Sequence, residues 1–213
     1  METGTKITAV CGWAISPEWF GGKVAEFFPS ARIRAVYPLR PADREEAEKL
    51  LADAPADLYI GYSLGSLWLL HHRERLPSGA RKALLAPILA FPRERESGGK
   101  TSIVQLKYLM RELERRPGDS FVLKDFYVRC GLSNDDPSLP GLPDRQTLIR
   151  GLEFLSQIEE PGSSASGFIA VLGDEDNLLD SGEMKRHLPH LDIAPSAGHA
   201  PEPLLERLAE LLR

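Results

Sequence analysis

The segment Gly61–Gly65, with the sequence Gly-Tyr-Ser-Leu-Gly, constrains the fold more than any other part of the chain. It follows the apolar run Leu58–Ile60, which is typical of a buried strand, and it leads into an apolar-rich run typical of a helix. A serine on such a sharp turn projects its hydroxyl above the edge of a sheet, and the flanking glycines leave room for a strained backbone. Because a hydroxyl is a poor nucleophile until a base takes its proton, Ser63 implies a histidine and an acid elsewhere in the chain.

Short apolar runs alternate with helical patterns over most of the sequence. We predict strands at residues 7–10, 33–37, 58–62, 83–85, 168–172 and 191–194, and helices at residues 17–28, 43–52, 64–75 and 203–212. Asp43 and Glu46 have the form of a capping box at the start of the second helix. Strands that alternate with helices favour βαβ units, so the predicted class is α/β, with a mostly parallel sheet of about six strands flanked by helices.

Residues 91–167 interrupt this alternation. They contain three helical patterns, at residues 101–116, 120–130 and 144–160, and no convincing strand. Proline- and glycine-rich sequence at 116–118 and 137–143 separates the three patterns, and a small, serine-rich stretch at 162–167 leads back to the next strand. We therefore predict an α/β core formed by residues 1–90 and 168–213, with residues 91–167 as a small helical cap insertion.

Composition limits the kinds of partner and location. With 213 residues, of which 42% are hydrophobic and 27% charged, the chain can bury a core and resembles soluble globular proteins. Its net charge of −5 argues against nucleic acid or an anionic membrane as a partner. No apolar run approaches the roughly 18 residues that a membrane span needs. Two cysteines are too few for a disulfide framework and the start has no signal-peptide pattern, so we expect a cytoplasmic protein.

A carboxylate in the loop after a late strand is the expected acid. The strand predicted at residues 168–172 opens into Gly173-Asp174-Glu175-Asp176, so Asp174 and Asp176 both qualify. The acid usually lies three residues after a glycine at the strand end, which favours Asp176. Asp174 is then a turn former, although this reading applies to either residue. The chain order of serine, aspartate and histidine is the one that accompanies a Gly-x-Ser-x-Gly turn.

His199 is the predicted base. It lies between small residues, directly after the last predicted strand and before the last predicted helix, where it can reach across the strand ends to the serine. The other four histidines of the chain are interpreted as surface or helix-side residues: His71, His72, His187 and His190.

Stabilising the charge that develops on a substrate carbonyl oxygen requires backbone N–H donors close to the serine. One candidate is the N–H of Leu64, the residue after the predicted nucleophile. The other is the N–H of Trp13, in the loop after the first strand, where Gly12 lets the chain turn. Cys11 precedes this loop, and because no base is predicted beside it, a buried thiol is a better interpretation than a nucleophile.

With these residues in view, the chain resembles the α/β-hydrolase superfamily along nearly its whole length, and within it the BioH-type pimeloyl-[acyl-carrier protein] methyl ester esterases of biotin synthesis. Three segments carry the likeness: Gly12-Trp13 with the later Trp19, the Gly61–Gly65 turn, and Gly198-His199-Ala200-Pro201.

The resemblance implies an α/β-hydrolase fold and hydrolysis of a carboxylic ester through an acyl-enzyme. Ser63 would be the nucleophile, Asp176 the acid and His199 the base, with Trp13 and Leu64 as oxyanion-hole donors. The insertion would cover the acyl pocket, and no metal or organic cofactor is needed.

Three features depart from the BioH-type pattern. Cys11 stands where a histidine usually precedes the oxyanion-loop glycine, and Glu202 stands where a phenylalanine usually follows His-Ala-Pro. The chain also lacks the N-terminal hairpin of larger members. Alternatives are therefore a general short-chain carboxylesterase or thioesterase and, in a different class, a non-catalytic binding protein of the same fold. In the second case the glycines of Gly61–Gly65 would only make a tight turn.

The first helix predicted in the insertion carries a row of cations. Lys107, Arg111 and Arg115 recur every four residues and so share one face. This row could bind an acidic acyl carrier protein that delivers the ester, whereas the alternative is a solvated charged face. Aromatic residues of the insertion are candidates for an acyl pocket, although core packing explains them equally well: Tyr108, Phe121, Phe126 and Tyr127. Tyr62 and Trp68, next to the serine turn, are interpreted as packing residues.

Overall fold

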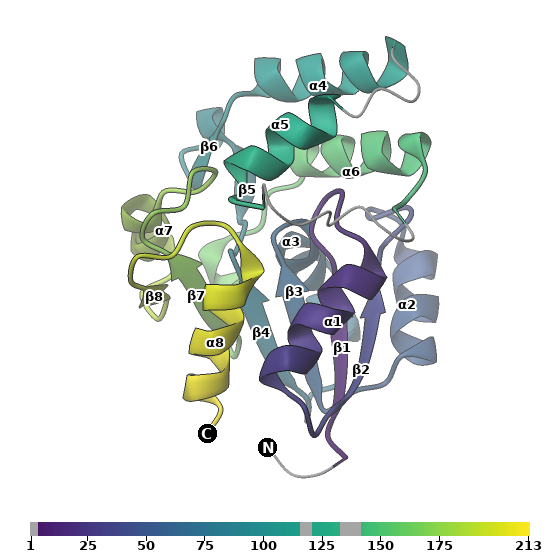
Figure 1. The fold of residues 1–213 in the computed structure, drawn as a ribbon, viewed down its shortest axis with the longest axis vertical. Coiled ribbons are helices and arrows are strands. Elements are labelled where there is room, and N and C mark those ends of the chain that lie inside the picture. The colour runs from purple at the N-terminus through teal and green to yellow at the C-terminus, as the bar shows by residue number, and fades with distance from the viewer. Residues whose placement is uncertain (1–3, 116–120, 133–141) are drawn as a thin grey trace.

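A parallel sheet forms the centre of the computed structural model, which describes residues 4–115, 121–132 and 142–213 (Figure 1). Its strands are β1 (Lys6–Val10), β2 (Arg32–Val36), β3 (Leu58–Tyr62), β4 (Arg81–Leu85), β7 (Ile169–Gly173) and β8 (Asp192–Ala194). They lie in the order β2-β1-β3-β4-β7-β8, and every neighbouring pair is parallel. The predicted α/β class and six-stranded sheet are confirmed. All six carboxyl ends therefore meet at one edge of the sheet.

Helices cover both faces of this sheet. They are α1 (Pro17–Phe27), α2 (Arg44–Asp53), α3 (Leu64–His71), α7 (Ser181–His187) and α8 (Pro201–Leu211). Helices α1 and α8 lie side by side on one face, while α3 packs against β3 and β1 from the other (Figure 1). The helix predicted at 64–75 ends at His71 and is followed by a 3-10 turn at Arg73–Arg75. The short, polar α7 was not predicted because it lacks an apolar stripe.

The start of α2 differs in detail from the predicted capping box. Asp43 caps the helix, since its carboxylate accepts the N–H groups of Glu45 and Glu46 at 2.9 and 3.1 Å. The Glu46 side chain does not return to Asp43. It accepts the N–H groups of Leu39 and Arg40 at 2.9 and 2.6 Å and thereby holds the preceding loop.

The insertion lies between β4 and β7, above the carboxyl ends of the strands (Figure 1). It contains the three predicted helices, as α4 (Ile103–Arg115), α5 (Phe121–Arg129) and α6 (Arg145–Gln157). The expectation of no strand was wrong, because β5 (Ala90–Pro92) and β6 (Gly98–Thr101) form a parallel pair. Glycines and a proline hid this pair from a search for apolar β-branched runs. Of the predicted separators, 116–118 and 137–141 lie outside the described residues.

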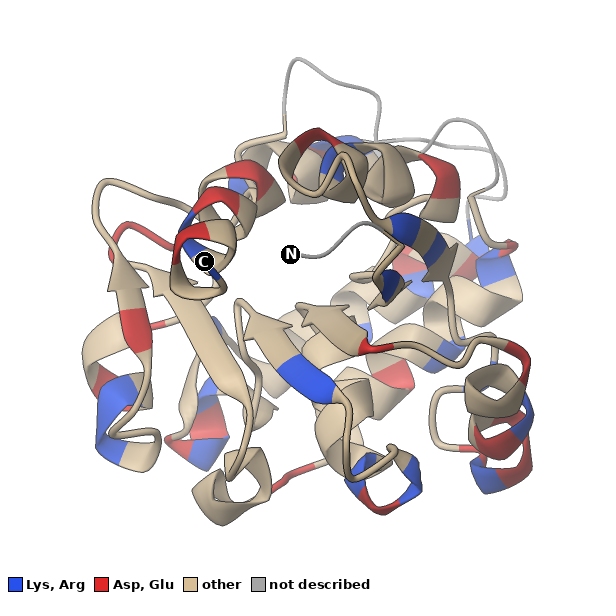
Figure 2. Cartoon of the chain, turned by 90° about the horizontal axis from the view of Figure 1, so that it is seen from below, with Lys and Arg blue, Asp and Glu red and all other residues tan. Residues whose placement is uncertain are grey.

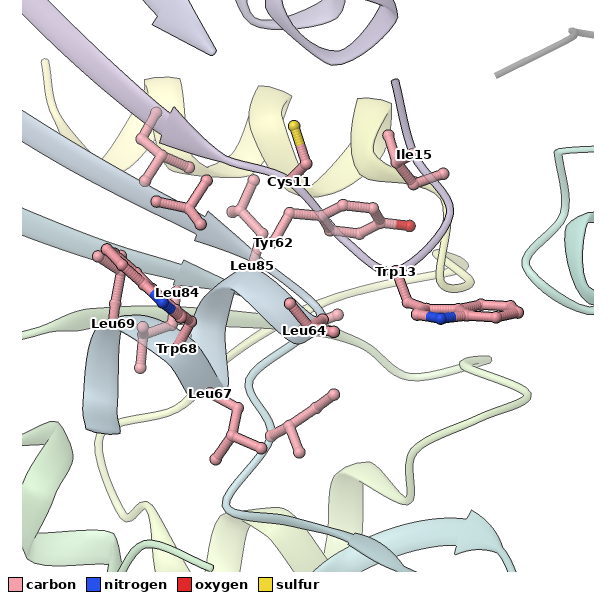
Figure 3. Packing of buried hydrophobic residues seen from close by; sticks show 14 of the residues in the cluster. Cys11, Trp13, Ile15, Tyr62, Leu64, Leu67, Trp68, Leu69, Leu84 and Leu85 are labelled. Carbon is pink, nitrogen blue, oxygen red and sulfur yellow. The ribbon is translucent and has the colours of Figure 1, made fainter. Parts of the chain in front are cut away.

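Helix α3 is surrounded by protein, and Figure 3 shows the buried side chains around it. Residues 64–70 are all buried, because the sheet lies on one side of α3 and α6 of the insertion on another. A helix that is apolar all round is stable only in such a position. Trp68 is 1% exposed and its ring contacts that of His72, so its interpretation as a packing residue is confirmed.

Charged residues lie mainly on the helices, where Lys and Arg are mixed with Asp and Glu (Figure 2). Within the described ranges, no helix is both long enough and apolar enough to cross a bilayer.

Candidate active site

Ser63 lies at a strained turn between β3 and α3. Its φ and ψ are 54° and −113°, a conformation that a non-glycine residue adopts only when its surroundings enforce it. Both flanking positions have room only for glycine. A Cβ on Gly65 would overlap the carbonyl oxygen of Val10, and one on Gly61 would overlap that of Gly65. Because these two residues have no side chain, the start of α3 packs closely against β1 and β3, and Ser63 lies at the edge of the sheet.

Three predicted residues form one hydrogen-bonded chain at this edge. The Oγ of Ser63 lies 3.0 Å from Nε2 of His199, and Nδ1 of His199 lies 2.7 Å from Oδ2 of Asp176. Their exposed fractions are 6%, 2% and 1%, so bulk water does not compete for these bonds. In this geometry the imidazole can take the serine proton while the carboxylate stabilises the resulting positive charge.

The carboxylate of Asp176 is fixed by its own loop. Its Oδ1 accepts the N–H groups of Leu178 and Leu179 at 2.7 and 3.0 Å, which leaves Oδ2 for His199. Burial by itself raises the pKa of Asp176, but the interaction with His199 and the two N–H bonds outweigh it and hold the pKa below its usual value. Asp174, the other candidate acid, is exposed to solvent.

The histidine and acid loops are neighbours because β7 and β8 are paired. A Cβ on Gly173 would overlap the carbonyl oxygen of Ala197, so this glycine permits the close approach of the two loops. Glu175 N–H also donates to Ala197 at 2.9 Å.

Tyr62 has a second role beyond packing. Its hydroxyl donates to the carbonyl oxygen of His199 at 2.9 Å, and its ring lies 5.5 Å from the imidazole. The contact joins residues 137 apart in the sequence, and only the order of strands in the sheet could have indicated it.

The loop after β1 lies against the serine. A Cβ on Gly12 would be 3.3 Å from that of Ser63 and 2.9 Å from ring atoms of Tyr62, so only glycine fits without a shift. The backbone N–H groups of Trp13 and Leu64 are both buried, and neither donates to an acceptor in the described part of the chain. Buried N–H groups are rarely left unpaired, so these two are available to a substrate oxygen.

The insertion contacts this loop directly. The indole Nε1 of Trp13 donates to the carbonyl oxygen of Leu148 on α6 at 2.8 Å. Gly151, one turn later on α6, lies so close that a Cβ would be 2.8 Å from the indole. From α5, the Tyr127 hydroxyl donates to Ala14 at 2.8 Å and the Phe126 ring meets Trp13 edge-on at 4.7 Å. Two helices of the insertion, α5 and α6, therefore hold the loop that carries Trp13.

Phe126 and Tyr127 were two of the four candidates for an acyl pocket, and the other two are Tyr108 and Phe121. Tyr108 on α4 is 60% exposed, so it is not packed in the core, which was the alternative to an acyl pocket. The Phe121 side chain lies outside the described residues. Lys107, Arg111 and Arg115 are all exposed on α4, the helix farthest from the sheet (Figure 1).

Both cysteines are buried free thiols. Burial raises the pKa of Cys11, which lies directly after β1, so it is a protonated packing residue as predicted (Figure 3). Burial, together with the charge of Asp176, raises the pKa of Cys130 well above its usual value.

One of the four histidines expected at the surface or beside a helix lies at the end of α3 and is buried there. His72 is 2% exposed, its Nε2 lies 2.9 Å from the carbonyl oxygen of Pro41, and burial lowers its pKa. His71 pairs with Glu160 at 2.9 Å. Among residues that the structure describes, no group of three or more His, Cys, Asp or Glu side chains is arranged to hold a metal.

Comparisons with known proteins identify the fold. No protein-family model and no curated protein matches the chain. Among solved structures, a thermophilic esterase from Thermogutta terrifontis is 16% identical, with a TM-score of 0.67 over 100% of this chain and 89% of that one. The N-formylmaleamic acid deformylase of Pseudomonas putida is 12% identical, with a TM-score of 0.66 over 99% and 92%. The bottromycin epimerase BotH is 16% identical, with a TM-score of 0.66 over 99% and 91%.

These likenesses establish that the chain has the α/β-hydrolase fold. At such low identity they do not select a reaction, since an esterase, a deformylase and an epimerase all share the architecture. The function has to be argued from the side chains at the strand ends.

Proposed function

We propose that this protein is a serine hydrolase that cleaves carboxylic esters through a covalent acyl-enzyme. The observation that carries the proposal is the buried chain of hydrogen bonds from Ser63 through His199 to Asp176. A serine beside a base, with that base held by a third group, is the arrangement that activates a hydroxyl for attack.

In the acylation step, the Oγ of Ser63 forms a bond to the carbonyl carbon of the ester while Nε2 of His199 takes the hydroxyl proton. The carbonyl oxygen becomes an oxyanion that accepts the N–H groups of Trp13 and Leu64. As the intermediate collapses, the ester C–O bond breaks and His199 gives its proton to the departing alcohol. The acyl group is then bound to Ser63.

Deacylation repeats these steps with water as the nucleophile. His199 takes a proton from the water as its oxygen bonds to the acyl carbon, and it returns that proton to Ser63 as the acid leaves. In both halves Asp176 holds the imidazole tautomer and stabilises its positive charge without becoming protonated itself. The depressed pKa of Asp176 supports this role, because the carboxylate stays ionised at neutral pH.

Labelling with a fluorophosphonate probe tests the chemistry. The wild-type protein should be labelled, and Ser63→Ala should abolish labelling while the melting temperature stays close to that of the wild type. Labelling that persists in Ser63→Ala would contradict the assignment of the nucleophile. A wild-type protein that resists the probe would favour the alternative of a non-catalytic binding protein.

For the substrate, we propose an acyl ester carried by an acidic carrier protein, as in the BioH-type pimeloyl-[acyl-carrier protein] methyl ester esterases. The exposed cations of α4 support this, because Lys107, Arg111 and Arg115 form a row that such a partner could meet. The alternative is a general short-chain carboxylesterase or thioesterase. Specificity constants for a methyl pimeloyl carrier ester and for a panel of p-nitrophenyl esters would separate the two, since only the first proposal predicts a preference for the carrier ester.

A further inference from the structure

Strand β6 of the insertion is paired with the loop that carries the acid. Gly99 forms an antiparallel bridge with Leu179. On either side of this bridge, Lys100 N–H donates to Leu178 at 2.9 Å and Asp180 N–H donates to Gly98 at 2.7 Å. The insertion and the acid loop are therefore connected by backbone bonds, although β6 and the acid are far apart in the sequence.

This pairing reaches the carboxylate. Leu178 accepts the N–H of Lys100, and Leu179 lies opposite Gly99 in the bridge. The N–H groups of these same two residues hold Oδ1 of Asp176. The position of β6 relative to the loop therefore bears on these two donors, which orient Oδ2 toward His199. Strand β6 of the insertion is therefore connected to the Asp176 carboxylate through the backbone of Leu178 and Leu179.

The side chain of Lys100 adds a direct contact. Its Nζ donates to the backbone carbonyl oxygen of Asp176 at 2.6 Å. Hydrogen bonds from a charged donor are shorter and stronger than neutral ones. Asp176 is thus held at its carbonyl by the Lys100 ammonium and at its carboxylate by the Leu178 and Leu179 N–H groups.

We propose that Lys100 is a positioning residue for Asp176, which fixes the backbone of the acid so that its carboxylate stays aligned with His199. This inference rests on the proposed function, because alignment matters only if His199 becomes positively charged during turnover. In this proposal Lys100 acts through the acid, by its bond to the carbonyl oxygen of Asp176.

The strand itself is anchored without the ammonium. A Cβ on Gly99 would overlap the carbonyl oxygen of Phe91 on β5, and Gly98, with φ at +91°, lies against Met184. A methionine at position 100 would keep these backbone contacts and the length of the side chain, and would remove only the ammonium donor. Replacement of Lys100 therefore tests one hydrogen bond rather than the stability of the strand.

The experiment compares Lys100→Met, Lys100→Arg and a matched exposed lysine on α2, Lys49→Met, using p-nitrophenyl acetate. We expect Lys100→Met to lower kcat about tenfold with KM within about twofold of the wild type, because a lost charged hydrogen bond changes alignment and not substrate binding. Lys100→Arg should restore most of kcat, and Lys49→Met should match the wild type. An unchanged kcat in Lys100→Met, or a rise in KM alone, would overturn the proposal.

A second measurement does not depend on turnover. The proton on Nδ1 of His199, bonded to Asp176, should give a far-downfield proton NMR signal in the wild type. Lys100→Met should shift that signal upfield or abolish it, and Lys100→Arg should keep it. The same signal in both variants would contradict the positioning role. If the wild type neither turns over esters nor binds the fluorophosphonate probe, the proposed function fails, while the NMR comparison still decides on Lys100.

Discussion

The loops at the strand ends and the insertion contribute to the candidate active site in different ways. Ser63, Asp176 and His199 all lie on short loops directly after strands, and all three are buried. The insertion supplies none of these three side chains, yet Lys100 and Tyr127 bond to the loops that carry the acid and Trp13. The core therefore provides the three side chains of the candidate active site, and the insertion bonds to loops beside them.

The insertion has an inner part that contacts the core and an outer helix that is exposed. Its inner part, formed by β6, α5 and α6, bonds to the core loops, whereas the outer helix α4 presents exposed residues such as Val104 and Tyr108, which are 73% and 60% exposed. A variant that loses an inner contact should turn over every substrate more slowly. A variant changed on α4 should be slower only with a substrate whose carrier binds that surface.

The largest expected effect comes from the acid. Asp176→Asn keeps the shape of the side chain but removes its charge and favours the wrong imidazole tautomer, so kcat should fall about 10,000-fold. Asp174→Asn, in the same loop but exposed, is the control and should stay within about twofold of the wild type. Steady-state kinetics on p-nitrophenyl acetate checks both. Equal losses in the two variants would remove the distinction between the two aspartates.

The next effect concerns the turn at Ser63. Gly65→Ala places a methyl group on the carbonyl oxygen of Val10, so we expect a loss of more than about 3 kcal/mol in the free energy of unfolding. Gly79→Ala is the matched control, because an added Cβ there meets nothing within 4 Å. Denaturant unfolding of both variants measures the difference. A Gly65→Ala protein as stable as Gly79→Ala would show that α3 can move away from β1.

The sequence predicts those parts of the site that follow from local patterns, and it fails for contacts between residues far apart in the sequence. Ser63 and His199 could be found because each lies in a local pattern, a strand followed by small residues and then a helix. Asp174 and Asp176 both follow β7, and the spacing from Gly173 favours Asp176 without excluding Asp174. The distinction arises from the N–H groups of Leu178 and Leu179, which bind the carboxylate of Asp176, whereas Asp174 is exposed to solvent.

The contacts that the sequence did not predict join distant segments. Lys100 meets Asp176 across 76 residues, and Trp13 meets Leu148 across 135. Such pairs depend on the order of strands and on how the insertion folds back, neither of which a periodicity reports. Strand β6 was missed for a related reason, because its glycines are selected by close backbone contacts and not by side-chain packing.

A smaller effect should distinguish the two layers of the insertion. Tyr127→Phe removes a hydrogen bond that holds the loop carrying Trp13, so we expect kcat to fall about three- to tenfold, since a typical hydrogen bond contributes about 0.5–1.5 kcal/mol. Tyr108→Phe removes the same hydroxyl from the outer layer and should leave kcat unchanged. Turnover of a short free ester measures both. An effect of Tyr108→Phe as large as that of Tyr127→Phe would contradict the division.

The buried acid should also affect stability at low pH. Burial opposes ionisation of Asp176, but His199 and the N–H bonds hold its folded-state pKa below the unfolded value of about 3.9. The carboxylate therefore stabilises the fold above that unfolded value, and this contribution is lost as pH falls through the folded pKa. Between pH 7 and pH 3 the wild type should lose more unfolding free energy than Asp176→Asn. Chemical denaturation at the two pH values tests this, and equal losses would show that the carboxylate is not preferentially stabilised.

The smallest effect on free esters is expected at the outer surface of α4. Reversing Lys107, Arg111 and Arg115 to glutamate changes a solvated face that bonds to none of the core loops described here, so turnover of p-nitrophenyl acetate should stay within about twofold of the wild type. With a carrier-bound ester, the same variant should lose at least about tenfold in kcat/KM at low salt, and the loss should shrink as salt rises, because rim charges act mainly on association and are screened. Equal effects on both substrates would remove the case for carrier docking and would leave the general esterase as the better account, since the outer layer would then contribute nothing that depends on the partner.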